Sequence, residues 1–193
     1  MRDGQVVNGL SLRVARNCGN PHMGLQSAPK QLMGREIERK YLVKDESWRQ
    51  HAGRGIHYQQ GYLCLDMERS VRVRVGGGKG TITLKGKPEG AARDEFEYPI
   101  PADDGRQILE RICVKPIIEK IRYEIRVGGL KWEVDEFFGE NRGLVVAEIE
   151  TGKLSGEIAK PDWVGEEVTD DPRYFNLNLV KQPYLQWQQP VGN

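Results

Sequence analysis

The chain has 193 residues, of which 30% are charged, yet 29 Lys and Arg against 28 Asp and Glu leave a formal net charge of only +1. This balance gives no bulk electrostatic attraction for nucleic acid or for an anionic membrane surface, so neither is expected as a partner. No apolar run approaches the ~20 residues that span a bilayer, and the three widely spaced cysteines fit a reducing cytoplasm better than a disulfide framework or a zinc site.

The first 32 residues differ from the rest of the chain. They mix Gly, Asn, Pro and Gln without an apolar period, and they lack the continuous apolar core of a signal peptide. We expect residues 1–32 to be a disordered extension, or to lie upstream of a natural start at Met33. Residues 33–182 then form a single domain of ordinary size, and residues 183–193 form a C-terminal tail.

From residue 33 onward the dominant signal is an apolar period of two, which is typical of β-strands. Gly76–Gly80 and the Val127-Gly128-Gly129-Leu130 stretch are each predicted to turn the chain between two strands of a hairpin. The predicted strands are rich in Val, Ile, Tyr and Thr and cover residues 36–43, 57–64, 70–75, 81–87, 93–100, 117–127, 130–137 and 144–151.

Helical signals are few. Residues 103–113 place apolar side chains along one face, residues 45–52 form a short predicted helix capped by Asp45, and residues 170–182 carry Pro172 at a first turn. Many strands with short links and little helix favour a mainly β, α+β fold. We predict an eight-stranded antiparallel sheet that closes into a barrel with a few flanking helices.

The charged residues of these strands share one phase. Side chains two positions apart lie on the same face of a strand, so Arg72 and Arg74 lie opposite the intervening Val73. An open sheet with one wet face would also give this pattern, but the chain has too little helix to cover an open sheet. A closed barrel with its apolar face outward would line its interior with seven basic and eight acidic residues: Lys40, Arg72, Arg74, Lys85, Lys87, Lys120, Arg122, Glu36, Glu38, Glu95, Glu97, Glu133, Asp135, Glu148 and Glu150.

Such an interior indicates a charged ligand. Unpaired buried charges are very costly, so this lumen must hold water, ions or a ligand of its own. Carboxylates suit hard divalent cations such as Mg²⁺ or Mn²⁺, while Arg and Lys suit phosphate oxygens. Acidic and basic groups in one cavity therefore fit a complex of metal with polyphosphate.

Motifs with paired charged residues follow one another along most of the chain. The stretch Glu36-Ile37-Glu38-Arg39-Lys40 reads ExExK, and it is followed by VRVRV (71–75), TLKGK (83–87), EFEY (95–98), EKIRYEI (119–125), WEVDEF (132–137), AEIE (147–150) and WVGEEVTDDPRYFN (163–176). This ordered set resembles the CYTH superfamily, the triphosphate tunnel metalloenzymes. The resemblance covers residues 34–180 and is greatest to the bacterial inorganic triphosphatases.

The resemblance implies roles for particular residues. Catalytic roles fall to Glu36, Glu38 and Lys40. The substrate would be held by Lys40, Arg72, Arg74, Lys85, Lys120 and Arg122. The metal ligands would be Glu36, Glu38, Asp135, Glu148 and Glu150.

The implied activity is metal-dependent hydrolysis of a triphosphate, with inorganic tripolyphosphate as the favoured substrate and two Mg²⁺ or Mn²⁺ ions as cofactors. One ion would orient and neutralise the phosphates, and a second would lower the pKa of an attacking water. The alternatives are a class IV adenylyl cyclase, a thiamine triphosphatase, a non-catalytic polyphosphate-binding module and a plain structural barrel. A homodimer is left open.

Overall fold

The computed structural model describes residues 37–87, 94–151 and 158–187. The chain divides into two units, Met1–Leu32 and Met33–Asn193, and every described residue belongs to the second unit. The predicted extension at residues 1–32 and the predicted site residue Glu36 lie outside the described residues.

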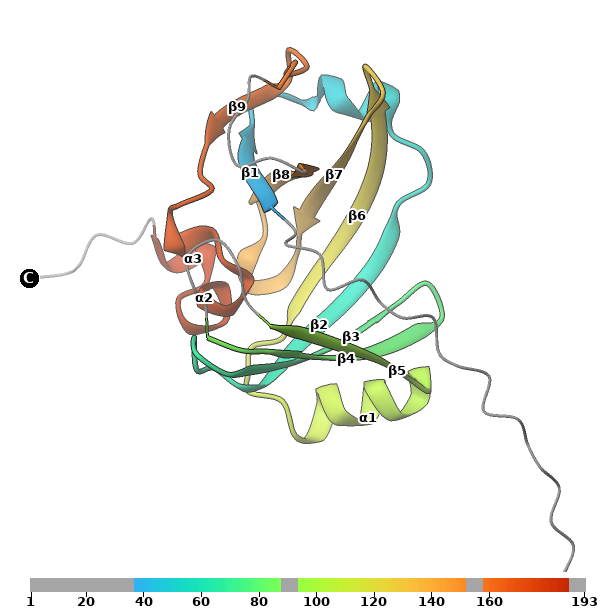
Figure 1. Cartoon of the computed structure of the whole chain (residues 1–193), viewed down its shortest axis with the longest axis vertical. Helices are drawn as coiled ribbons and strands as arrows, with labels where there is room; N and C mark the ends of the chain where they lie inside the picture. The colour runs from blue at the N-terminus through green and yellow to red at the C-terminus, as the bar shows by residue number, and fades with distance from the viewer. Residues whose placement is uncertain (1–36, 88–93, 152–157, 188–193) are drawn as a thin grey trace, which may run out of the picture. The chain divides into compact units, whose positions relative to one another are not determined.

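The described part of the chain contains nine strands and few helices (Figure 1). The strands are β1 (Ile37–Val43), β2 (Ile56–Cys64), β3 (Ser70–Gly76), β4 (Lys79–Lys85), β5 (Glu95–Ile100), β6 (Ile118–Val127), β7 (Leu130–Phe137), β8 (Val145–Thr151) and β9 (Val164–Glu167). The helices are α1 (Ala102–Arg111), α2 (Asn176–Lys181) and α3 (Tyr184–Trp187), with 3₁₀ turns at Glu46–His51, Gly139–Asn141 and Pro172–Tyr174. None of these helices is long and apolar enough to cross a membrane.

The strands form one antiparallel sheet in the order β5-β4-β3-β2-β6-β7-β8-β1-β9. The predicted mainly β, antiparallel architecture is confirmed, but the predictions of eight strands and of closure are wrong. The ninth strand, β9, pairs with β1 at Tyr41 and Val43, and so takes the edge of β1 that closure would need. At the other end of the sheet, β5 pairs only with β4 among the described strands and contains Pro99, which lacks an N–H donor.

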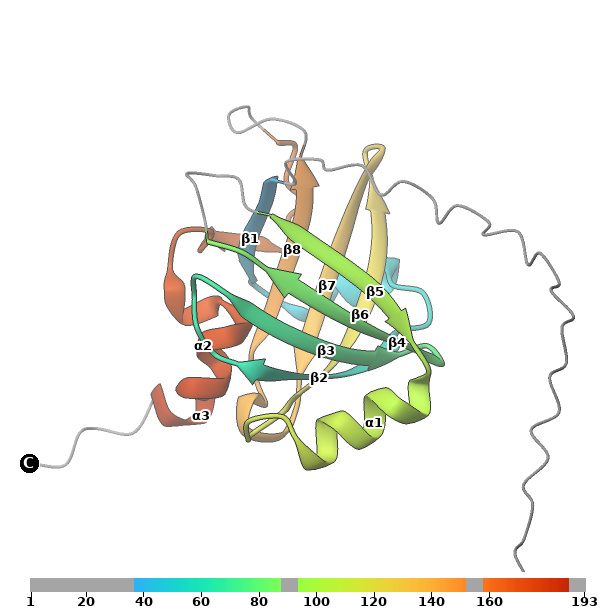
Figure 2. The same ribbon diagram turned by 60° about the horizontal axis from the view of Figure 1, so that its bottom comes forward.

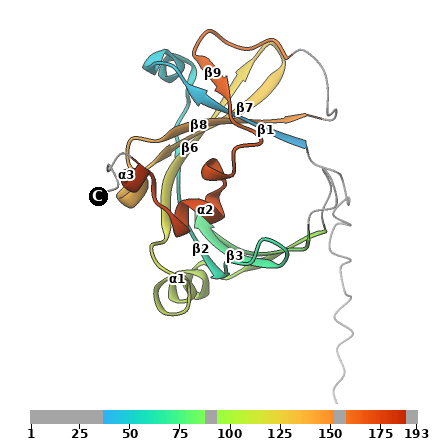
Figure 3. The same ribbon diagram turned by 90° about the vertical axis from the view of Figure 1, so that its left-hand side faces the viewer.

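The sheet curves strongly, so that it has a concave and a convex face (Figures 2 and 3). Helix α1 packs beneath β3 and β4 on the convex face (Figure 1), where Leu109 and Cys113 contact Val73 and Val75. The convex side of β1, β6, β7 and β8 is covered instead by a second core that includes Trp48 from the first 3₁₀ turn and Trp163. Many apolar residues of the strands therefore face outward, as the alternation of the sequence predicts.

Helix α2 lies within the curve of the sheet (Figure 3). Its Leu177, Leu179 and Val180 pack against Tyr62 and Ile118 of the concave face. The predicted helix over 170–182 is divided at Phe175, which adopts an extended backbone with φ −73° and ψ 129°. The concave face thus has an apolar end beneath α2 and a polar end beyond it.

The short links are as expected at both glycine turns. Gly77 and Gly78 have φ of +57° and +77°, and Gly128 and Gly129 have φ of +58° and +79°. These left-handed conformations suit two-residue hairpins and favour glycine. The turns fix the register of β3 with β4 and of β6 with β7, on which the charged face depends.

Candidate active site on the concave face

The strand register brings most of the predicted charged residues onto the concave face. Lys87 is an exception, because it lies beyond the end of β4, where its side chain is 67% exposed and pairs with Glu68. Residues that lie directly opposite one another in an antiparallel pair share a face. The opposed pairs include Lys40 with Glu148, Arg122 with Asp135, Arg72 with Thr83, Thr83 with Glu97, and Lys85 with Glu95. Two clusters result, one on each side of β2.

The first cluster, here the acid–base network, spans β1, β6, β7 and β8. It consists of Glu38, Lys40, Lys120, Arg122, Glu133, Asp135 and Glu148. Arg122 donates from Nε to Asp135 Oδ1 at 2.7 Å and from a terminal nitrogen to Asp135 Oδ2 at 2.6 Å. Lys120 is 1% exposed and Asp135 0%, and their side chains form a salt bridge. These charges are buried, but each has a partner of opposite sign.

The charges within the network perturb one another. Burial favours the protonated form of Glu148, yet Lys40, Arg122 and Lys120 outweigh it and hold the pKa of Glu148 well below its usual range. Desolvation and the Glu148 carboxylate raise the pKa of Glu38, although Lys40 opposes this shift. Desolvation and the neighbouring Arg122 lower the pKa of Lys120. The network therefore holds two adjacent carboxylates with opposite shifts, bridged by the Lys40 ammonium group.

The second cluster, here the arginine cluster, spans β3, β4 and β5. It consists of Arg72, Arg74, Lys85, Glu95 and Glu97. Its arginine pairs are long, with both Arg72 and Arg74 lying 3.7 Å from Glu97. Desolvation and the nearby Arg72 lower the pKa of Arg74. This cluster therefore holds its two arginines loosely, whereas Lys85 pairs closely with Glu95 at 2.7 Å.

Strand β2 separates the two clusters with uncharged polar side chains. Tyr58 lies under the Arg74 guanidinium, 5.3 Å from its carbon to the ring centroid. Gln60 and Tyr62 lie opposite Arg74 and Arg72, and both are buried. The sequence analysis did not assign these residues to the site because it followed charges alone, although the alternation of β2 would have placed them there.

The predicted metal ligands are only partly brought together. Glu38 lies opposite Glu150 and next to Glu148, on β1 and β8. Asp135 lies on β7 with both carboxylate oxygens bound by Lys120 and Arg122. Within residues 37–87, 94–151 and 158–187, no three His, Cys, Asp or Glu side chains are grouped closely enough to hold a metal ion.

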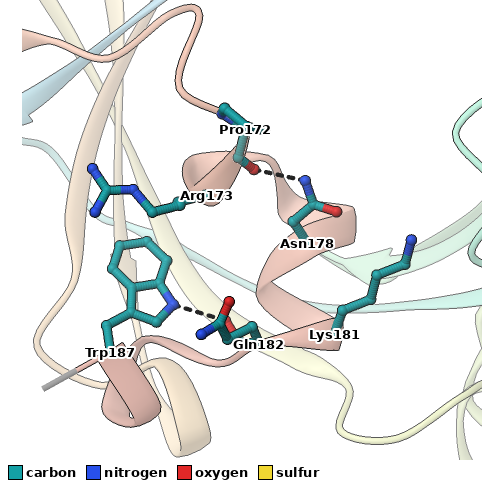
Figure 4. Close-up of a pocket in the computed structure, with 6 residues that line it drawn as sticks. All are labelled: Pro172, Arg173, Asn178, Lys181, Gln182 and Trp187. Atoms are coloured by element: carbon teal, nitrogen blue, oxygen red, sulfur yellow. Dashed lines mark hydrogen bonds between the residues drawn. The ribbon is translucent and has the colours of Figure 1, made fainter. Parts of the chain in front are cut away.

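A separate cavity of about 280 Å³ lies beside the C-terminal helices (Figure 4). Arg173 extends over Trp187, whose ring nitrogen donates to the Gln182 carbonyl at 2.9 Å (Figure 4). The cavity is lined by Pro172, Arg173, Asn178, Lys181, Gln182 and Trp187. None of the residues of the acid–base network or of the arginine cluster lines this cavity.

Comparisons with known proteins agree with this architecture. The CYTH domain matches residues 34–184. An inorganic triphosphatase of Acetivibrio thermocellus is 50% identical over 157 residues, which cover 81% of this chain and 100% of the relative. An inorganic triphosphatase of Nitrosomonas europaea is 34% identical over 161 residues, covering 75% of this chain and 96% of the relative.

The solved structures extend this likeness to three dimensions. A crystal structure of an inorganic triphosphatase aligns with a TM-score of 0.57 at 30% identity, covering 75% of this chain and 93% of the other. A Bacillus halodurans structure aligns with a TM-score of 0.50 at 18% identity, which supports the fold alone. The chain belongs to the CYTH domain family.

Proposed function

We propose that the protein is a hydrolase that splits inorganic triphosphate with water into pyrophosphate and phosphate. The observation that carries this proposal is the concave face, where six cations from β1, β3, β4 and β6 share one face of the sheet with the adjacent carboxylates Glu38 and Glu148. Its support from relatives is that the chain spans 100% and 96% of two proteins named inorganic triphosphatase. The free thiols of Cys64 and Cys113 suit the cytoplasm as the proposed location.

The arginine cluster is proposed to bind the phosphates. Arg72 and Arg74 are held by carboxylates at 3.7 Å or more, beyond hydrogen-bond distance. A phosphate group offers shorter, charge-assisted and bidentate hydrogen bonds to such guanidinium groups. The arginines can therefore exchange carboxylate neighbours for substrate at little cost.

The acid–base network is proposed to hold the reacting end of the substrate. Lys40, Lys120 and Arg122 are fixed by buried carboxylates before any substrate arrives. Preorganised cations stabilise the charge that develops on a transferring phosphoryl group without reorganising during the reaction. In this proposal the network supplies catalysis, while the arginine cluster supplies most of the binding.

Mg²⁺ or Mn²⁺, as two ions, remain part of the proposal. The oxygens of Glu38, Glu148 and Glu150 are of the type that hard divalent cations prefer. The Glu148 carboxylate helps to raise the pKa of Glu38 even though the Lys40 ammonium group bridges the two, so a divalent cation would add to the positive charge that Lys40 already supplies there. When bound, the ions would neutralise phosphate charge and lower the pKa of a bound water. Asp135 suits this role less, because Lys120 and Arg122 already bind both of its oxygens.

The test is phosphate release from tripolyphosphate with Mg²⁺, with Mn²⁺ and with EDTA. We expect metal-dependent release, and we expect Glu38→Gln to lower turnover by about 100-fold or more. Glu110→Gln, on the exposed side of α1, is the matched control and should keep full turnover. Full turnover by Glu38→Gln would remove Glu38 from the site, and no release by the wild type would overturn the proposed function.

The same protein should be incubated with ATP and with thiamine triphosphate. Cyclic AMP as the product of ATP would replace the hydrolase by the cyclase considered above. Faster hydrolysis of thiamine triphosphate than of tripolyphosphate would keep the chemistry and change the substrate. Binding of tripolyphosphate without turnover of any of the three compounds would leave a binding module.

A further inference from the structure

Gln60 occupies the middle of β2, between the two charged clusters. Its side chain is 1% exposed, and it lies opposite Arg74 on β3 and Ile118 on β6. The amide nitrogen donates to the Tyr62 hydroxyl at 3.1 Å. The amide oxygen is buried and has no hydrogen-bond partner in the part of the chain that the structure describes. One half of this side chain is therefore anchored and the other half is unsatisfied.

Arg72 also has a buried polar atom without a partner in the described part of the chain, in this case a hydrogen-bond donor. Its Nε is also buried without a hydrogen-bond partner among the described residues. A terminal nitrogen donates to Thr83 Oγ1 at 3.1 Å and faces Glu97 at 3.7 Å. Because Tyr62 lies opposite Arg72 and Gln60 lies opposite Arg74, Gln60 and Arg72 are diagonal neighbours on one face. Long side chains can bridge this diagonal spacing.

The two unsatisfied atoms fit each other. Gln60 offers an acceptor and Arg72 a donor, and burial without a partner is unfavourable for both. If the Gln60 amide were flipped, its NH₂ group would face the arginine N–H groups, and two donors would oppose each other. The amide oxygen is therefore the atom that suits a position beside arginines. A turn of the Arg72 side chain away from Glu97 would satisfy both atoms at once.

We propose that Gln60 is a positioning residue for Arg72 in the substrate complex. When triphosphate binds, the Arg72 side chain turns away from Glu95 and Glu97, and the Gln60 oxygen then accepts a hydrogen bond from Arg72 Nε. The two terminal nitrogens of Arg72 are left side by side for phosphate oxygens, which is the bidentate geometry that guanidinium groups favour. This inference rests on the proposed function and adds a neutral residue to its binding site.

The chain supplies a matched control for the first experiment. Gln59 is adjacent in sequence but points to the opposite face, where it donates to Glu119 at 2.9 Å. Gln60→Met keeps the side-chain length and removes the acceptor, and we expect it to raise the KM for tripolyphosphate about tenfold with a smaller change in kcat. Gln59→Met should stay within about twofold of the wild type in both constants. A KM of Gln60→Met within about twofold of the wild type would overturn the proposal.

A double-mutant cycle separates positioning from packing. Lysine has no Nε–H group, so Gln60 has nothing to orient in Arg72→Lys. Adding Gln60→Met to Arg72→Lys should therefore change the KM by less than about twofold. The same tenfold increase in both backgrounds would make the role of Gln60 independent of Arg72 and would contradict the proposal.

A direct measurement needs no stable Gln60 variant and no turnover. In the wild-type chain, the ¹⁵N–¹H resonance of Arg72 Nε is assigned by its loss in Arg72→Lys. Adding tripolyphosphate in the presence of EDTA should shift this resonance downfield as the new hydrogen bond forms. An unmoved resonance at saturating tripolyphosphate would refute the proposal, whereas absent hydrolysis by the wild type in the metal assay counts only against the proposed function.

Discussion

The acid–base network and the arginine cluster line the same concave face but are built differently. In the network the charged groups are in direct contact, and Lys120, Asp135 and Glu148 are exposed by only 1%, 0% and 8%, although the Glu38 side chain is 47% exposed. In the arginine cluster the arginine–carboxylate distances are 3.7 to 3.9 Å, and Glu95 and Glu97 have side chains 36% and 26% exposed. The network satisfies its charges internally, and the arginine cluster leaves its two arginines with only long carboxylate contacts.

This difference separates stability from binding within one site. Removing one partner of a buried ion pair leaves an uncompensated charge and is strongly destabilising. Loose and partly exposed pairs contribute little to stability, so their residues can serve a substrate instead. Substitutions in the network should therefore act on folding first, and those in the arginine cluster on substrate binding first.

The largest expected effect comes from Asp135→Asn. The substitution leaves Lys120 and Arg122 without their shared carboxylate in the least exposed part of the site. The free energy of unfolding should fall by about 3–5 kcal/mol, measured by urea denaturation without substrate. An unchanged urea midpoint would show that the two cations find other partners, and the contrast between the clusters would fail.

Arg74→Gln should weaken substrate binding while leaving the stability of the fold almost unchanged. Desolvation and Arg72 lower the pKa of Arg74, so the cation is held against its preference and its loss should change the free energy of unfolding by less than about 1 kcal/mol. The KM for tripolyphosphate should rise about tenfold, which corresponds to about 1.4 kcal/mol. Urea denaturation and steady-state kinetics on one preparation check both halves. A loss of stability as large as that of Asp135→Asn would make the two clusters equivalent.

The ion pair between Arg39 and Glu167, outside both clusters, gives an intermediate case. A hydrogen bond from Arg39 lowers the pKa of Glu167 to about 2. Because the folded pKa lies below its ordinary value, the pair stabilises the fold above about pH 4.5, and this contribution is lost as the pH falls toward 2. Glu167 is one-third exposed, so the contribution is on the order of 1 kcal/mol.

Arg39→Gln tests that contribution by acid titration of unfolding. The difference in the free energy of unfolding between wild type and variant should shrink as the pH is lowered through this range. A difference that stays constant with pH would show that Glu167 does not carry it.

The smallest effect is expected from Glu97→Gln. The carboxylate contacts Arg72 and Arg74 only at 3.7 Å, and it accepts a hydrogen bond from Thr83 at 3.0 Å. Stability should change by less than about 1 kcal/mol, and the KM for tripolyphosphate should fall because a competing anion is gone. A higher KM would show that Glu97 orients the arginines instead of competing for them.

The sequence predicted the faces of the strands well, because side-chain alternation is a local property. Arg72 and Glu97 lie on one face of the sheet, as the alternation within β3 and within β5 predicts. The ninth strand was missed because β9 has only four residues, too few to show an alternation. Closure was wrongly predicted because pairing along a sheet edge depends on which strand arrives there, and no local pattern encodes it.

The sequence predicted which charged residues belong to the site, but not all of the ion pairs that they form. The metal role of Asp135 was implied by the family resemblance, whereas its contacts with Lys120 and Arg122 follow from the register of β6 with β7. The Gly128-Gly129 turn sets that register, so the Arg122–Asp135 pair follows from a hairpin that the sequence showed. The Lys40–Glu148 pair joins strands that no turn connects, and the sequence alone does not show it. Gln60 was not selected because a neutral amide stands out only when its burial and its missing partner are known.

The pairing of the first described strand with β8 has a consequence for biosynthesis. The contact of Lys40 with Glu148 joins positions 108 apart in the chain, whereas Arg72 and Thr83 are 11 apart and Thr83 and Glu97 are 14 apart. Local hairpins close with little loss of chain entropy, and distant contacts form late. On the ribosome the arginine cluster can therefore assemble while the C-terminal third of the chain is still being made. The acid–base network is completed only after β8 has emerged and brought Glu148 to Lys40 and Arg122, so the two halves of the concave face form at different stages of synthesis.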